Sequence, residues 1–304
     1  MNPLNELAST NCDCLPPPEI ALALPPKEWH GENSIGLSWS VYNGQADIVL
    51  QKLSNESVHC VVTSPPYFWL RDYHVVGQIG LEETVQDYVS AIGEVMEGVK
   101  RVLRDDGLLF LNIGDTYYSG KGESQGKDKK SSKRRFGLRA VDKSGGLGIG
   151  LQRKSLIGVP WRVAIDLAAR GWVLRSSVIW HREKCLPEHV KDRPRRSYEY
   201  VFILAKSRKY YFDKKPLIEQ KVDEDMWTIA AKPKSGNCLD TAPFPDELVE
   251  RCLKIGCLPG GTVLDPFLGS GTTARVALSM GHPVVGIELS EEFCSYAVNQ
   301  LRGG

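Results

Sequence analysis

The sequence predicts an α/β protein built on a wound, mixed but mostly parallel sheet. Short apolar runs of strand length alternate along the chain with segments whose apolar residues recur at helical spacing. A glycine turn of the kind that opens a helix follows one of these runs. The chain has 304 residues, of which 42% are hydrophobic and 25% charged, so it is long enough to bury a sizeable core.

The expected elements follow in chain order. Residues 1–35 are expected to form an irregular N-terminal arm, because prolines cluster at 16–18 and 25–26. A strand and a short helix are expected within 38–53. Further strands are predicted at 58–62, 108–113, 173–180, 199–206, 262–264 and 283–287. Helices are predicted at 85–103, 160–170, 245–255, 272–279 and 291–301.

The composition argues against a membrane protein and against a secreted disulfide scaffold. The apolar runs are far shorter than a bilayer requires, and the first ten residues lack a basic stretch followed by an apolar one. The eight cysteines show no regular framework, so reduced thiols are expected. No cysteine or histidine pairs have the spacing of zinc ligands, so no metal is expected. A cytoplasmic location follows from these observations.

The charge of the chain is concentrated in one segment. The net charge is only +1, but residues 119–155 hold seven lysines and four arginines against three acidic residues, a net charge of +8. The segment is rich in glycine and poor in apolar residues, which predicts a loop. Taken alone, it is either a solvated insert without a partner or a surface that contacts phosphates.

The stretch Thr63-Ser64-Pro65-Pro66-Tyr67 ends the buried strand predicted at 58–62. Two consecutive prolines remove two backbone donors and fix φ near −65°, so they restrain the chain just beyond the strand. Ser64 precedes a proline and is therefore biased towards an extended conformation. On its own, the stretch fits a rigid loop whose Tyr67 covers the edge of the core as well as it fits a functional loop.

A second stretch, 265–274, follows the strand predicted at 262–264 and opens a helix. Gly269 and Gly271 allow a tight turn that brings helix amides close to a ligand. Thr272 stands where a Walker loop needs lysine, but Glu288 lies 19 positions after Gly269 at the end of the next strand, where a carboxylate accepts ribose hydroxyls. Little chain remains after Glu288, so the sheet is completed by earlier segments and the catalytic half precedes the cofactor half.

These stretches, with Gly-Ile-Glu-Leu-Ser at 286–290, resemble the β-class amino-group DNA methyltransferases of restriction-modification systems. The resemblance covers about residues 36–301, and supporting it are the stretches 112–115, 197–201 and 242–245. Serine at the first position of Ser-Pro-Pro-Tyr is similar to the cytosine-N4 subgroup. The resemblance implies a Rossmann-like methyltransferase domain over 36–304 in circularly permuted order. It also implies S-adenosylmethionine as cofactor and double-stranded DNA as substrate, and a cognate restriction endonuclease is an expected partner of the system.

The resemblance assigns the residues. Ser64 and the carbonyl of Pro65 accept the two N–H bonds of an exocyclic amine, Pro66 fixes the loop, and Tyr67 stacks on a base flipped out of the duplex. No enzyme nucleophile is needed, because the attack on the methyl group is direct. The cofactor is expected to contact Phe244, Pro245, Asp265, Pro266, Phe267, Gly269, Ser270, Gly271, Thr272 and Glu288. The insert at about 117–155, with Lys133, Arg134 and Arg135, is then expected to contact DNA, and 213–240 is a second candidate for base recognition.

Several assignments stay open at this point. Asp115 lines the base pocket or caps a turn, and Trp180 meets the flipped base or belongs to the core. Asn43-Gly44-Gln45 replaces a Gly-Asp pair that the family often has near the cofactor, and Asp47 is a doubtful substitute. Adenine N6 is the alternative target of the same fold. A catalytically silent nucleic-acid-binding protein and an RNA methyltransferase are the more distant alternatives.

Overall fold

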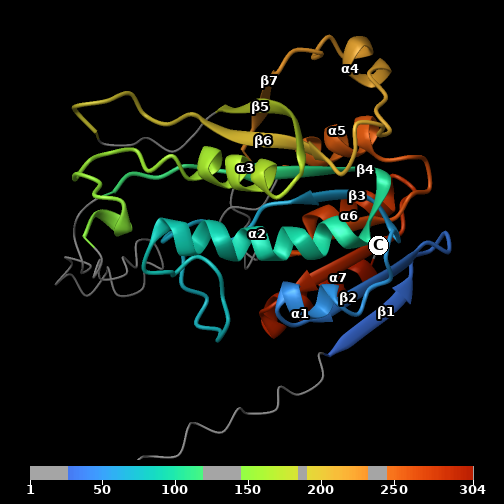
Figure 1. Cartoon of the computed structure of the whole chain (residues 1–304). Helices are drawn as coiled ribbons and strands as arrows, with labels where there is room; N and C mark the ends of the chain where they lie inside the picture. The colour runs from blue at the N-terminus through green and yellow to red at the C-terminus, as the bar shows by residue number, and fades with distance from the viewer. Residues whose placement is uncertain (1–26, 119–144, 184–189, 232–244, 304) are drawn as a thin grey trace, which may run out of the picture.

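The computed structural model describes residues 27–118, 145–183, 190–231 and 245–303. Its strands are β1 Glu28–Glu32, β2 Ser38–Asn43, β3 Val58–Thr63, β4 Leu103–Ile113, β5 Val173–Glu183, β6 Tyr198–Ala205, β7 Met226–Ala230, β8 Val263–Asp265 and β9 Val284–Glu288. Over these residues the strands form one nine-stranded sheet in the order β1-β2-β9-β8-β3-β4-β6-β5-β7 (Figure 1). The five strands from β2 to β4 in this order are parallel, whereas β1 and β6 run antiparallel to their neighbours. The predicted mixed, mostly parallel α/β sheet is therefore confirmed.

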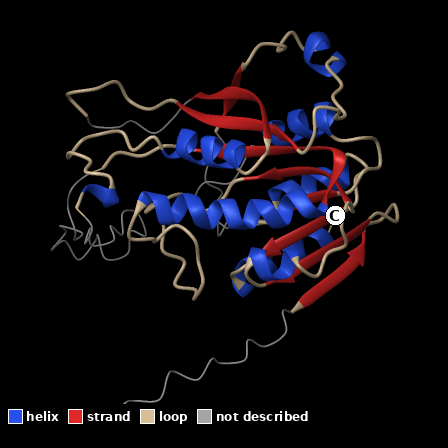
Figure 2. Ribbon diagram, viewed as in Figure 1, coloured by secondary structure: helices blue, strands red, loops and turns tan. Residues whose placement is uncertain are grey.

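Helices cover both faces of the sheet (Figure 2). They are α1 Ala46–Leu50, α2 Val85–Val102, α3 Val159–Ala169, α4 Lys215–Glu219, α5 Asp246–Gly256, α6 Thr272–Ser279 and α7 Glu291–Arg302, with a short 3-10 turn at Gly146–Gly148. The apolar side chains of α1, α2 and α3 share one core cluster, and those of α5, α6 and α7 share the other. The sheet thus lies between two helical layers, as in wound α/β proteins.

The long helix α2 shows how the sequence sets these elements. Thr84 caps its first turn by accepting the backbone N–H of Asp87. Lys100 and Arg101 lie in its last turn, where positive charges interact favourably with the helix dipole. Its buried positions, including Tyr88 and Ile92, recur at helical spacing and face the sheet. This packing fixes α2 directly beside the loop that follows β3.

Three elements differ from the sequence prediction. Strand β1 lies inside the segment expected to be an irregular arm, where it pairs antiparallel with β2. Strand β4 begins at Leu103 rather than at 108, with a register shift against β3 near its start. The polar segment expected at 213–240 contains α4 and the edge strand β7, and Trp227 of β7 is buried. Pairing with a neighbouring strand of the sheet forms β1 and β7, although their local signals are weak.

The strand order reverses between β3 and β8. From β3 the chain passes through α2 to β4 on one side, and from β8 it passes through α6 to β9 on the other. Ligands of open α/β sheets bind outside the carboxyl ends of the strands at such a reversal. The two stretches singled out in the sequence follow β3 and β8 directly and therefore meet there. None of the helices in the described ranges is long and apolar enough to cross a membrane.

Candidate active site

The loop after β3 is tied to its neighbours from two sides. Thr63, the last residue of the strand, is buried and donates its hydroxyl to Asp265 Oδ1 at 2.6 Å. The hydroxyl of Tyr88 in α2 donates to the carbonyl of Pro66 at 2.9 Å. In contrast, the carbonyl of Pro65 accepts no hydrogen bond within the described part of the chain. Hydrogen bonds thus hold the loop on both sides of Pro65, and its carbonyl has no donor among the described residues.

The hydroxyl of Tyr67 lies in a polar cluster made with three strands. It is 2.5 Å from Glu199 Oε2 in β6, 3.2 Å from Asn112 Oδ1 in β4 and 3.4 Å from Ser64 Oγ. Arg182 of β5 donates to the other oxygen of Glu199 at 2.9 Å. Burial, followed by the nearby carboxylate of Glu199, raises the pKa of Tyr67 well above its ordinary value. The phenol is therefore a neutral hydrogen-bond donor.

Gly114 makes room for this arrangement. A Cβ at this position would lie 2.8 Å from Cε2 of Tyr67 and 3.3 Å from Cδ of Glu199. Since real Cβ contacts are longer than the first distance, a side chain here would displace the tyrosine ring. The glycine in Asn112-Ile113-Gly114-Asp115 thus allows Tyr67 and Glu199 to meet.

The loop after β8 is shaped by Asp265. Its Oδ1 accepts the hydroxyl of Thr63 and the backbone N–H of Phe267, so its carboxylate joins the ends of β3 and β8. Burial raises its pKa to about 6. Gly271, with φ of +86°, caps α6 in the left-handed region, and a Cβ there would lie 3.0 Å from Ala297 of α7.

Glu288 ends β9 and faces this loop. Its Oε2 accepts the backbone N–H of Gly269 at 2.8 Å, and its Oε1 accepts that of Ser290 at 2.8 Å. Each oxygen keeps a further lone pair for another donor. Burial raises the pKa of Glu288 to about 7. The half-buried carboxylate beside a glycine turn has the acceptors that a ribose diol requires.

Asn43, which the sequence prediction left doubtful, also supports the end of β9. Its Nδ2 donates to the carbonyls of Glu288 and Leu289 at 3.1 and 2.8 Å. Asp47 is exposed on α1. The neutral side chain of Asn43 therefore holds the backbone next to Glu288 through two hydrogen bonds to carbonyl groups.

Two expected substrate residues have other surroundings. Asp115 accepts the backbone N–H groups of Thr116, Gly158 and Val159 and so caps the start of α3, as the turn-capping alternative predicts. Trp180 is 5% exposed and donates its indole N–H to the carbonyl of Ile229, which favours the core over the flipped base as its surroundings. Its position on β5 is a core position.

The other expected contacts divide between described and undescribed residues. Pro245 is buried just before α5, and Pro266, Phe267, Ser270 and Thr272 lie in and after the loop that follows β8. Phe244, Lys133, Arg134 and Arg135 lie outside the described residues. Among the described residues, no three His, Cys, Asp or Glu side chains are placed to hold a metal ion.

Part of a basic surface lies near the Ser64 loop. The guanidinium of Arg193 lies 3.9 Å from the centre of the Tyr117 ring, and that of Arg196 lies 5.9 Å from it. Arg196 also donates to the carbonyl of Asp115. These contacts hold the segment before β6 against the segment that follows β4. Lys191 and Arg195 of the same segment are exposed.

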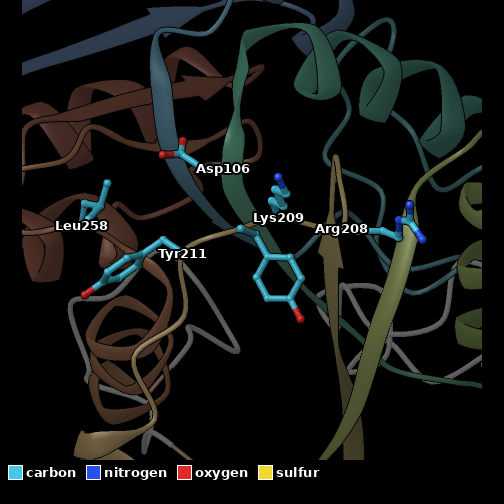
Figure 3. A pocket seen from close by; sticks show the side chains of 6 residues that line it. Asp106, Arg208, Lys209, Tyr211 and Leu258 are labelled. Carbon is cyan, nitrogen blue, oxygen red and sulfur yellow. The ribbon is translucent and has the colours of Figure 1, made fainter.

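A cavity lies at the opposite end of the sheet from these loops. Figure 3 shows the side chains that line it. It has a volume of about 660 Å³ and is lined by Asp106, Arg208, Lys209, Tyr210, Tyr211 and Leu258. Asp106 lies near the start of β4, so the cavity is at the amino ends of the parallel strands. It therefore lies away from the position where wound sheets bind their ligands.

The fold and the two loops at its strand reversal are those of a Rossmann-like methyltransferase. The chain belongs to the N6_N4_Mtase family of DNA methylases, whose family model matches residues 58–299. It is 43% identical over 272 residues to the type II methyltransferase M.SmaI of Serratia marcescens, covering 87% of this chain and 91% of that protein. It is 42% identical over 270 residues to M.Cfr9I of Citrobacter freundii, covering 87% and 88% of the two chains.

Solved structures share the fold. The cytosine-N4-specific PvuII DNA methyltransferase superposes with a TM-score of 0.68 at 20% identity over 90% of each chain. TTHA0409 of Thermus thermophilus, a putative DNA modification methylase solved with S-adenosyl-L-methionine, has a TM-score of 0.59 at 24% identity over 87% of this chain and 95% of that one. The family resemblance inferred from the sequence is confirmed.

The sequence did not single out Glu199, Arg182, Asn112 and Tyr88 as residues that hold the Ser64 loop. Asn112 and Glu199 lie in stretches that carried the family resemblance, but no local pattern links them to Tyr67, which is 132 residues from Glu199. The only available signal was the charge of Glu199 at the start of the strand predicted at 199–206, because glutamate is unusual on a buried strand. Arg182 lies beyond the strand predicted at 173–180 and carried no such signal.

Proposed function

We propose that this type II DNA methyltransferase transfers a methyl group from S-adenosylmethionine to the exocyclic N4 amine of cytosine in duplex DNA, after flipping the base. The observation that carries the proposal is Ser64, a hydroxyl at the first position of the tetrad, held beside the unused carbonyl of Pro65. The fold shared with a structure named as cytosine-N4-specific supports the same choice.

The residues at the strand reversal fit the cofactor. S-adenosylmethionine, when bound, supplies a methyl group activated on a sulfonium centre. Glu288 would accept its ribose hydroxyls, because each carboxylate oxygen has one backbone donor and a remaining lone pair. The turn at Gly269 and Gly271, with Phe267 beside it, would hold the methionine part, and Pro245 would lie on the far wall.

The loop after β3 would prepare the amine. An exocyclic amine is a poor nucleophile because its lone pair is conjugated with the ring. Two acceptors that take its N–H bonds favour the pyramidal form, and Ser64 Oγ and the Pro65 carbonyl are such acceptors. The prolines restrain both groups before the substrate arrives, so little ordering is required on binding. The half-buried ring of Tyr67 would stack on the base.

The basic segment before β6 would contact the DNA backbone. Lys191, Arg193, Arg195 and Arg196 lie within six residues of one another. The guanidinium groups of Arg193 and Arg196 pack against the ring of Tyr117. Cations of this kind bind phosphates and position the duplex without reading its sequence. The basic insert predicted at about 117–155 would extend the surface, although most of it lies outside the described residues. Residues 213–240 stay a second candidate for reading bases.

Adenine N6 is the second candidate target, because the family model covers methylases of both amines. The proposed activity is tested by incubating the protein with methyl-labelled S-adenosylmethionine and either duplex DNA or RNA of matched composition. Label recovered on cytosine of the DNA supports the proposal, whereas label on adenine supports the second candidate instead. Label found in RNA alone, or in neither nucleic acid, contradicts the proposal.

A further inference from the structure

The hydroxyl of Tyr67 connects Ser64 to an ion pair on the neighbouring strands. Its neighbours are Ser64 Oγ, Asn112 Oδ1 and Glu199 Oε2, and Glu199 is in turn bound by Arg182. The side chain of Glu199 is 12% exposed, so this is a mostly buried carboxylate with a defined partner on each oxygen. Such a group fixes the direction of the hydrogen bonds around it.

The donors and acceptors can be assigned from chemistry. An ionised carboxylate only accepts, so the single proton of Tyr67 goes to Glu199 at 2.5 Å. The amide of Asn112 is oriented by its own donation to the carbonyl of Tyr200 at 3.0 Å, which directs its oxygen to Tyr67 as a second acceptor. The proton of Tyr67 is thus used, and its oxygen can only accept from Ser64. Ser64 therefore donates to Tyr67 and keeps the lone pairs of its Oγ for another donor.

We propose that Glu199 is a positioning residue for methyl transfer: by accepting the proton of Tyr67, it directs the Tyr67 oxygen to the Ser64 hydroxyl and leaves the Ser64 lone pairs facing the target amine. The inference rests on the proposed function, because the amine acceptor it serves is Ser64. Arg182 holds Glu199 in place, and the missing side chain of Gly114 lets the carboxylate reach the phenol. Glu199 itself touches neither the methyl group nor the base.

The test compares Glu199→Gln and Tyr67→Phe, singly and together, in the full-length protein. An amide offers a donor as well as an acceptor, so the Tyr67 proton is no longer held away from Ser64. Each single variant is expected to lower kcat about tenfold while leaving the KM for S-adenosylmethionine and for DNA unchanged. The double variant is expected to lose no more than either single variant, because both changes break the same chain of hydrogen bonds.

A matched control separates positioning from general damage. Asp166→Asn removes a comparable half-buried ion pair with Arg170 in α3 and is expected to keep the wild-type kcat. Gly114→Ala retains every polar group but pushes on the Tyr67 ring, and it is expected to lower kcat without changing cofactor affinity. A cooperative thermal unfolding transition, measured for each variant, shows that the variant is folded. If Glu199→Gln does not fold, Tyr67→Phe and Gly114→Ala decide the question.

The outcomes of the two proposals are distinct. A wild-type protein that methylates no DNA base overturns the proposed function. A wild-type protein that methylates DNA, together with a Glu199→Gln variant of unchanged kcat, overturns the positioning role. The positioning role is also overturned if the kcat losses of the two single variants multiply in the double variant. It is overturned as well if the single variants change only KM. Unchanged kcat in Tyr67→Phe and Gly114→Ala overturns it when Glu199→Gln is unfolded.

Discussion

The carboxylate of Glu288 accepts the backbone N–H of Gly269 at 2.8 Å and thereby joins the end of β9 to the turn that opens α6. This contact brings the acceptor proposed for the ribose and the turn proposed for the methionine part into one unit. Asn43 strengthens the unit from β2 through the carbonyls of Glu288 and Leu289. Hydrogen bonds within the chain therefore join the residues proposed to hold the cofactor.

Replacing Glu288 by glutamine should weaken cofactor binding about tenfold to hundredfold, because hydrogen bonds to a charged acceptor contribute about 1.5–3 kcal/mol. The rate of methyl transfer at saturating cofactor should change much less. Calorimetric titration with S-adenosylmethionine measures the first effect and single-turnover kinetics the second. Glu291→Gln removes an exposed neighbouring carboxylate paired with Lys27 and serves as the control. An equal loss of affinity in both variants would contradict the role of Glu288.

Cofactor affinity should fall as the pH is lowered from 8 to 6. Burial raises the pKa of Glu288 to about 7, so the carboxylate is ionised at pH 8 and protonated at pH 6. The ionised form accepts two hydroxyl protons, whereas the protonated form has lost part of this capacity. The decrease should approach about tenfold per pH unit below 7 if only the ionised form binds. A Glu288→Gln variant that shows the same pH dependence would assign it to another group.

Replacing Ser64 by alanine should lower the single-turnover rate about fivefold to thirtyfold, since one hydrogen bond to the reacting amine contributes about 1–2 kcal/mol. Cofactor affinity should stay near the wild-type value, because Ser64 lies on the β3 loop and Glu288 on β9. Rapid-quench measurement with prebound labelled cofactor gives the rate. Thr63 is an unsuitable control because it donates to Asp265. Ser57→Ala, in the exposed turn before β3, is the matched serine control, because within the described part of the chain its hydroxyl contacts only the carbonyl of Ser54. A loss of cofactor affinity without a loss of rate would reverse the assignment of Ser64.

Replacing Arg193 by alanine should weaken duplex DNA binding uniformly across sequences and make it less dependent on salt. One fewer phosphate contact lowers the slope of log affinity against log salt by about 1. Fluorescence anisotropy over a range of salt concentrations measures the slope. Arg208→Ala, at the cavity on the opposite end of the sheet, should leave it unchanged. Equal slopes for wild type and Arg193→Ala would remove Arg193 from the DNA surface.

The sequence predicted the parts of the fold whose signals are local. The strand before Ser64, the helix α2 and the turn at Gly269 each carry a strong periodicity or a specific residue at a required position. Strands β1 and β7 were missed, because they have five residues each and depend on pairing with β2 and β5. The alternation that buries Trp227 and Ile229 in β7 is too short to be distinguished from a loop.

The same holds for the site: the residues that belong to local motifs were predicted from the sequence, and the contacts between distant residues were not. Ser64, Tyr67 and Glu288 belong to motifs that are read along the chain. The contact of Tyr67 with Glu199 joins the loop after β3 to β6, and β4 lies between these two strands in the sheet, so no pattern in the sequence indicates the contact. Asp115 and Trp180, in contrast, were singled out from the sequence as candidate substrate residues. Both lie near strand ends beside the site, but one caps α3 and the other fills the core.

The identity of the methylated base tests the central claim most directly. Duplex DNA of mixed sequence is incubated with the protein and S-adenosylmethionine, digested to nucleosides and examined by mass spectrometry. The account predicts N4-methylcytosine, which disappears with Ser64→Ala. N6-methyladenine as the product would leave the fold and the cofactor site intact but would contradict the claim that Ser64 marks a cytosine-N4 enzyme.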